Sequence, residues 1–144
     1  GGGALRRRRT AVVIVDTSAI VAIALNEPDR DRLIDALLDE ADPKMSAATA
    51  VEVAAVLIRR MAPEDFRRVQ RLIDQLGIRT VPVDDDHAAS AIRAYRDFGR
   101  GSGHRARLNL GDCYSYALAD VTGEPLLYVG EDFSHTDLAA ADPG

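Results

Sequence analysis

The chain has 144 residues, of which 47% are apolar and 28% charged, and this composition is typical of one globular domain rather than a disordered segment. No apolar run approaches the roughly 20 residues that cross a bilayer, and a single cysteine excludes an internal disulfide framework and suits a reducing cytoplasm. The formal net charge is −5, and it becomes −9 without the four arginines at positions 6–9, which excludes a general electrostatic affinity for nucleic acid.

Residues 1–10 form a Gly/Arg-rich leader without hydrophobic periodicity. Because no apolar segment of the signal-peptide type follows it, we expect a remnant of cloning, an extended start or a native basic arm. The predicted folded domain is 11–144.

The first predicted element is the β-branched run at 12–15, which is typical of a strand buried on both faces of a parallel sheet. This strand delivers Asp16 to its carboxyl end, where open α/β sheets hold their ligands. An acid buried there needs a cation, a hydrogen-bond donor or water. A short helix is predicted over 18–25, with Thr17 or Ser18 as its N-cap.

A second helix is predicted over 29–40 and a short strand over 44–47. Thr49, followed three residues later by Glu52, matches the capping box, in which a hydroxyl and a carboxylate bond reciprocally to backbone amides at a helix start. A helix is therefore predicted from Thr49 to about Met61. The spacing leaves open whether Glu52 is only a capping residue or has a chemical role.

The rest of the chain continues this alternation, and the acidic run 84–86 indicates a solvated turn and helix start. Residues 100–107 form a basic loop, after which Asn109 is the expected cap of a helix that carries Asp112. Strands that alternate with helices predict an α/β fold, a single domain with a central parallel sheet of about four or five strands flanked by helices. The further helices are expected over 63–76, 88–98 and 110–121, and the further strands over 78–83 and 126–129.

Four carboxylates lie at junctions of the predicted elements: Asp16, Glu52, Asp112 and Asp132. Hard divalent cations prefer such oxygens. Two of these ions about 4 Å apart can activate water and stabilise the leaving oxygen of a phosphodiester. Structural alternatives stay open, because Asp112 suits a helix first turn, and Asp132 and Asp137 suit turns or caps.

Other chemistries have little support, since the sequence lacks a Gly-rich phosphate loop, an HExxH motif and a paired-cysteine zinc pattern. We interpret Cys113 as a core residue rather than a reactive thiolate. His104, in the basic loop, is either solvated or in contact with phosphate.

Together these segments resemble the PIN-domain family and, within it, the VapC-like ribonuclease toxins of type II toxin–antitoxin pairs. The resemblance runs from about Val12 to Ala140, so it covers nearly the whole chain. Each motif alone is short, and their order and element context make the set specific. The motifs are 15–19, 49–52, 107–117 and 129–133 with 136–137.

The resemblance implies Mg²⁺, with Mn²⁺ as a substitute, bound by Asp16 and Asp112. Glu52 and Asp132 would complete the acidic pocket, with Asp137 as the rival for the fourth place. The implied activity is metal-dependent endonucleolytic hydrolysis of RNA by an activated water, by which a toxin inhibits translation and growth.

The resemblance also implies substrate contacts and partners. The partners would be RNA, a small antitoxin that covers or plugs the site, and a second copy in a homodimer, in the cytoplasm and without a membrane. Short polar side chains would orient ligands or phosphate, and arginines would steer the RNA backbone toward the acidic pocket. These residues are Thr17, Ser18, Asn109, Arg100, Arg105 and Arg107.

Two other functions compete with this interpretation. The first is a catalytically silent PIN-like module that binds RNA or protein, against which the intact set of acids counts. The second is a receiver-like signalling domain, which also gathers acids at strand ends but needs a lysine near the end of the sheet. The only lysine, Lys44, lies early in the chain.

Overall fold

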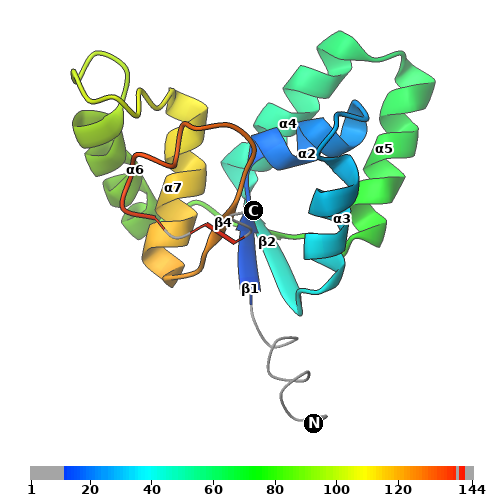
Figure 1. Cartoon of the computed structure of the whole chain (residues 1–144), viewed down its shortest axis with the longest axis horizontal. Helices are drawn as coiled ribbons and strands as arrows, with labels where there is room; N and C mark the ends of the chain where they lie inside the picture. The colour runs from blue at the N-terminus through cyan, green and yellow to red at the C-terminus, as the bar shows by residue number, and fades with distance from the viewer. Residues whose placement is uncertain (1–11, 139, 142–144) are drawn as a thin grey trace, which may run out of the picture.

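A four-stranded parallel sheet in the order β3-β2-β1-β4 forms the centre of the computed structural model, which describes residues 12–138 and 140–141 (Figure 1). The parallel α/β architecture predicted from the alternation is confirmed. The Gly/Arg leader lies outside the described residues. The strands are β1 Val12–Val15, β2 Asp42–Ser46, β3 Arg79–Val81 and β4 Leu126–Leu127, so β3 and β4 are shorter than expected.

Helices cover both faces of the sheet, with α2 to α5 on one side and α6 and α7 on the other (Figure 1). Among the described residues, no helix is both long and apolar enough to span a bilayer. The bounds are α2 Thr17–Ala24, α3 Arg30–Leu38, α4 Ala47–Arg60, α5 Pro63–Gln75, α6 Asp85–Phe98 and α7 Leu110–Thr122.

Strand β1 contributes to two hydrophobic cores because successive side chains of a strand point to opposite faces. Val13 and Val15 pack with α2 to α5, whereas Ile14 packs with α6 and α7. All three are almost fully buried. The continuous apolar run at 12–15 therefore has the two-sided burial that the sequence predicted.

Two helix starts differ from the sequence-based predictions. Asp16 itself, rather than Thr17 or Ser18, is the N-cap of α2, and its carboxylate accepts from the backbone N–H of Ser18. Helix α4 begins at Ala47 with Ser46 as its N-cap, so the capping box predicted at Thr49 is wrong. The physical reason is that β2 runs directly into α4, and its last hydroxyl meets the free amides before Thr49 is reached.

Two other helix starts match their predictions. Asp84 caps α6 by accepting from the backbone N–H of His87, which makes the acidic run 84–86 a helix start. Asn109 caps α7, and its side chain forms a reciprocal capping box with Asp112. This capping box holds Asp112 in a fixed position in the first turn of α7.

Candidate functional site

Asp16 is the most deeply buried of the predicted acids, at the carboxyl end of β1 and 3% exposed. Its Oδ1 accepts from Ser115 Oγ at 2.6 Å, and its Oδ2 accepts from Ser18 Oγ at 2.7 Å. Burial raises the pKa of Asp16, and these hydrogen bonds oppose the rise. The carboxylate is thus held in one orientation by groups from α2 and α7.

Asp112 lies in the first turn of α7, where its Oδ2 accepts from the backbone N–H of Asn109 at 3.0 Å. The pKa of Asp112 is raised to about 7, chiefly by burial and in addition by the negative charges of Asp16, Asp132 and Glu52, while the hydrogen bond from Asn109 opposes the rise. The charges of the other three predicted acids therefore act on Asp112 through space, as groups at the same edge of a sheet should.

Glu52 is not a capping residue, since it lies inside α4 and its Oε1 accepts from Thr17 Oγ1 at 2.5 Å. Its carboxylate lies against the first turn of α7, because a Cβ on Gly111 would overlap it. The absence of a side chain at Gly111 is what lets Glu52 approach Asp112.

Asp132 and Asp137 have different surroundings in the loop after β4. Asp132 is exposed and is one of the three charges that act on Asp112. Asp137 accepts from Tyr116 Oη at 2.7 Å. Burial, followed by this hydrogen bond, raises the pKa of Tyr116.

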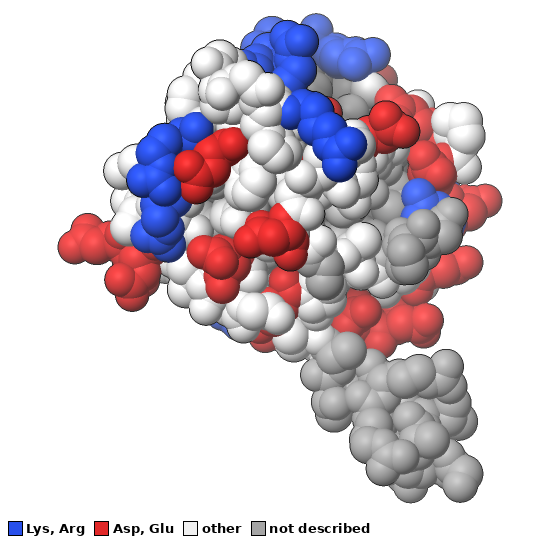
Figure 2. Space-filling view, turned by 60° about the vertical axis from the view of Figure 1, so that its left-hand side comes forward, with Lys and Arg blue, Asp and Glu red and all other residues white. Residues whose placement is uncertain are grey.

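The predicted arginines gather around one open cavity of about 360 Å³. Arg100, Arg105 and Arg107 line it together with Asp132 and His135. On the face that carries α6 and α7, basic and acidic side chains form clusters close to one another (Figure 2). Positive charge therefore lies directly beside the outermost of the four acids.

The short polar residues predicted to orient ligands or phosphate bond to the acids themselves. Thr17 donates to Glu52, Ser18 donates to Asp16, and the side chain of Asn109 accepts from the backbone of Asp112. Their observed role is to orient carboxylates.

Ser115 is the residue that the sequence analysis missed. It is fully buried, and its Oγ contacts both Asp16 Oδ1 and, at 3.2 Å, Thr49 Oγ1. The sequence could predict that Ser115 lies near Asp112, because a residue three places after Asp112 shares its face of a helix. The partner Asp16, however, is 99 residues away in the chain.

The donor chemistry of the site fits a hard divalent cation. Among the described residues, none of the four acids forms an ion pair with lysine or arginine. Within the same part of the chain, no three Asp, Glu, His or Cys side chains form a ready ligand set. Mg²⁺ does not need one, since it is usually bound by one or two carboxylates and keeps several waters.

Cys113 and His104, which had weaker sequence signals, both make contacts within the fold. Cys113 is fully buried, and burial raises the pKa of its thiol to about 11, which agrees with its interpretation as a core residue. His104 Nδ1 accepts from the backbone N–H of Ala106 at 3.0 Å, so this nitrogen helps to shape the basic loop.

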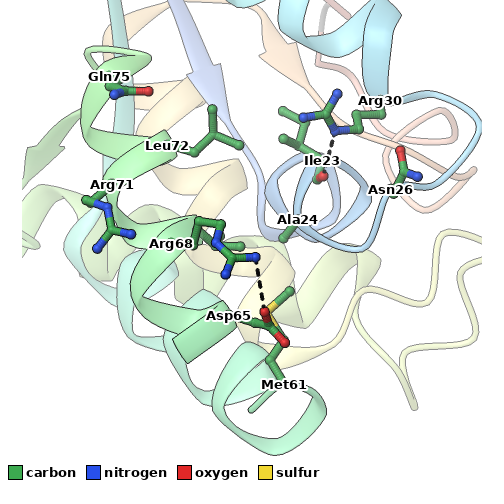
Figure 3. Close-up of a pocket in the computed structure, with 11 residues that line it drawn as sticks. Ile23, Ala24, Asn26, Arg30, Met61, Asp65, Arg68, Arg71, Leu72 and Gln75 are labelled. Atoms are coloured by element: carbon green, nitrogen blue, oxygen red, sulfur yellow. Dashed lines mark hydrogen bonds and ion pairs between the residues drawn. The ribbon is translucent and has the colours of Figure 1, made fainter. Parts of the chain in front are cut away.

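A second, larger cavity of about 690 Å³ lies between α5 and the end of α2, and it contains none of the predicted site residues (Figure 3). Its lining combines apolar side chains such as Ile23 and Leu72 with Arg30, Arg68 and Arg71. Arg68 pairs with Asp65 at 3.3 Å. This cavity is therefore mixed in character, apolar and basic.

Comparisons with known proteins identify the family and the fold. The PIN domain family matches residues 13–138. Ribonuclease VapC42 of Mycobacterium tuberculosis is 57% identical over 129 residues, which cover 90% of this chain and 98% of the relative.

Solved structures share the fold at low sequence identity. The crystal structure of Mycobacterium tuberculosis VapC20, a Sarcin-Ricin loop cleaving toxin, has a TM-score of 0.72 and 18% identity, over 91% of this chain and 99% of that one. A toxin–antitoxin complex from Klebsiella pneumoniae has a TM-score of 0.61 and 16% identity, over 85% and 90% of the two chains.

Proposed function

Because this chain belongs to the PIN domain family and, within it, to the VapC ribonucleases, we propose that it is the toxin of a toxin–antitoxin pair. In this role it is a metal-dependent endoribonuclease that hydrolyses RNA phosphodiester bonds and thereby inhibits translation and growth. The observation that carries the proposal is the gathering of buried Asp16 and Asp112 with Glu52, whose carboxylate lies against Gly111 beside Asp112. The charges of Asp16, Asp132 and Glu52 contribute to the raised pKa of Asp112. A buried carboxyl with other acids close to it, none of them paired with a protein cation, favours an external cation.

In this proposal Asp16 and Asp112 hold Mg²⁺, for which Mn²⁺ can substitute, and Glu52 and Asp132 complete the pocket. The bound cation supplies Lewis-acid activation of water and neutralises charge at the scissile phosphate. Thr17, Ser18, Asn109 and Ser115 act as positioning residues, because their hydrogen bonds fix the carboxylates in orientations that water alone would not hold.

The arginines offset the repulsion between the acids and the RNA backbone. A pocket of four carboxylates repels an RNA backbone, and Arg100, Arg105 and Arg107 lie around the cavity that also contains Asp132. Positive charge at that position attracts the phosphates and guides them toward the acids. Hydrolysis then depends on the RNA strand passing between the basic loop and Asp132.

The antitoxin in this proposal docks on the mixed cavity between α2 and α5. Arg30, Arg68 and Arg71 surround a lining that includes Ile23 and Leu72, which fits an amphipathic segment with acidic side chains (Figure 3). Such a segment would match both the apolar surface and the positive charge. A segment bound there would leave a continuation of its chain free to cover the acidic site.

We further propose a homodimer and a cytoplasmic location. Helix α4 exposes Val51 and Ile58, which are 70% and 61% exposed and lie seven residues apart on one face. A second copy of the chain would cover this apolar face. The single cysteine, Cys113, is free and buried, which suits a reducing compartment.

The experiment that tests the proposed function is cleavage of total RNA by the purified protein, first in chelator and then with Mg²⁺ restored. Cleavage that requires the metal and is lost in Asp112→Asn, while circular dichroism stays native-like, supports the ribonuclease. A native-like wild type that binds RNA but leaves it intact under every metal condition would instead favour the catalytically silent binding module.

A further inference from the structure

Two loops line the same cavity, the one that contains Asp132. The basic loop, residues 100–107, supplies Arg100, Arg105 and Arg107, and the acidic loop, residues 130–137, supplies Asp132 and its neighbours. Neither loop is part of a sheet or a long helix, so contacts with the fold must fix the distance between them.

The acidic loop is tied to α7 through Tyr116. This side chain is 6% exposed, and its Oη donates to Asp137 Oδ1 at 2.7 Å. Tyr116 lies one helical turn after Asp112, so the helix that presents one acid also holds the loop that presents another. Phe133, which is buried, gives the loop its second anchor.

The basic loop is supported by the same tyrosine, through Phe98 at the end of α6. The rings of Tyr116 and Phe98 lie 5.7 Å apart, and the rings of Phe98 and His104 lie 4.9 Å apart in an edge-to-face arrangement. His104 Nδ1 in turn accepts from the backbone N–H of Ala106. A continuous series of contacts therefore joins the two loops.

We propose that Tyr116 is a positioning residue for RNA cleavage, which sets both walls of the RNA path. Its hydroxyl fixes the loop that carries Asp132, and its ring, through Phe98, supports the loop that carries the arginines. In this arrangement Asp137 serves as the anchor of the acidic loop. The inference rests on the proposed ribonuclease function and adds to it the residue that aligns basic and acidic groups along the strand.

The first test is Tyr116→Phe, which removes the hydroxyl and keeps the ring. The kcat for RNA cleavage should fall about tenfold, because Asp132 loses its fixed position. The salt dependence of RNA binding should stay as in the wild type, since the arginines and the Phe98 contact remain. Tyr95→Phe on α6 makes the same chemical change at a half-exposed tyrosine and should keep the wild-type kcat.

The second test separates anchoring from charge at Asp137. Asp137→Asn keeps an acceptor oxygen for Tyr116 and should cleave within about twofold of the wild type, whereas Asp137→Ala should reproduce the loss seen in Tyr116→Phe. The double variant should lose no more than either single variant, because both remove one interaction. If Asp137→Asn is as inactive as Asp137→Ala, Asp137 acts through its charge and the inference is overturned.

Hydrogen–deuterium exchange supplies a readout that does not depend on cleavage. Exchange at the amides of Thr136 and Leu138 should accelerate in Tyr116→Phe and stay unchanged in Tyr95→Phe. Unchanged exchange and unchanged kcat in Tyr116→Phe would overturn the inference even if the wild type is a ribonuclease. A wild type without cleavage under any metal would instead refute the proposed function, and with it the role of Tyr116 in cleavage.

Discussion

Ser115 Oγ donates a 2.6 Å hydrogen bond to Asp16 Oδ1, which joins α7 to the carboxyl end of β1 across 99 residues of sequence. Both residues are almost completely buried. A hydroxyl donor in this position stabilises the ionised carboxylate against the cost of burial. The hydrogen bond therefore contributes both to the stability of the fold and to the ionisation of Asp16.

Ser115→Ala should accordingly affect both stability and activity. Loss of a hydrogen bond to a charged group costs about 1.5–3 kcal/mol, and RNA cleavage per folded molecule should fall because Asp16 loses its orientation. Ser90→Ala is the matched control, because Ser90 is equally buried and its Oγ donates a 2.7 Å hydrogen bond to Asp120. Asp120 is not one of the four acids of the candidate site. Denaturant melts and cleavage rates give both quantities. Equal activity in the two variants would show that the Ser115 bond is only structural.

Gly111→Ala separates helix stability from the position of Glu52. Alanine in a helix is favoured over glycine by up to about 1 kcal/mol, which offsets the loss of the Thr17–Glu52 hydrogen bond, so the melting temperature should change little. The new methyl group would displace the Glu52 carboxylate, and cleavage should fall at least about tenfold.

Glu52→Gln gives a second measure of the same carboxylate, since the amide can still accept from Thr17 but carries no charge. It should lose cleavage at an unchanged melting temperature, whereas Glu64→Gln, at an exposed first-turn acid of α5, should not. Wild-type turnover in both Gly111→Ala and Glu52→Gln would leave Glu52 with a structural role alone.

Ionised Asp112 should destabilise the protein in chelator. Its pKa is raised from 3.8 to about 7 in the folded state, so the folded protein binds this proton more tightly than the unfolded chain does. Protonation of Asp112 therefore stabilises the folded protein. This contribution is complete below the pKa of the unfolded chain and is lost as pH rises through about 7. Asp112→Asn cannot ionise, so at pH 8 it should be more stable than the wild type by on the order of 1 kcal/mol, with no advantage near pH 4.

Asp86→Asn is the control for this effect, because Asp86 is an exposed acid in the first turn of α6 and its loss should only weaken a favourable helix-dipole interaction. Added Mg²⁺ should stabilise the wild type strongly and Asp112→Asn much less. If Asp112→Asn melts below the wild type at pH 8 and Mg²⁺ shifts both proteins equally, the carboxylates do not share one pocket.

Arg71→Glu tests the antitoxin surface. Arg71 is exposed and lines the cavity between α2 and α5, so charge reversal should raise the dissociation constant of the cognate antitoxin by about tenfold or more and leave RNA cleavage unchanged. Arg96→Glu on α6, on the opposite side of the sheet, should not affect antitoxin binding. Calorimetric titration with antitoxin compares the variants, and equal affinities would place the antitoxin elsewhere.

Local patterns were sufficient to predict much of this molecule. The apolar run at 12–15 predicted a strand buried on both faces, and the polar residue before α7 predicted the cap at Asn109. These features depend on side chains only a few residues apart. The same local rules failed at Thr49, because a strand that continues directly into a helix supplied an earlier cap, Ser46.

The contacts that define the candidate site are long-range, and spacing along the chain does not predict them. Thr17 meets Glu52 across 35 residues, and Ser115 meets Asp16 across 99. The sequence could propose that the acids gather at one sheet edge, since parallel strands end together. It could not predict that the neighbouring hydroxyls point at the carboxylates, because that depends on the packing of α2 and α4 against α7.

Whether these acids form one cation-binding pocket is decided by titrating Mn²⁺ into the chelator-treated wild type and Asp16→Asn, with heat of binding as the readout. Asp16→Asn keeps one of the two acceptor oxygens, which bond to Ser18 and Ser115 in the wild type, and its amide nitrogen can donate to the other hydroxyl. Circular dichroism should therefore show a retained fold. We predict saturable binding to the wild type and a loss of affinity of at least about tenfold in the variant. Equal affinity in two native-like proteins would show that Asp16 does not belong to a cation-binding pocket.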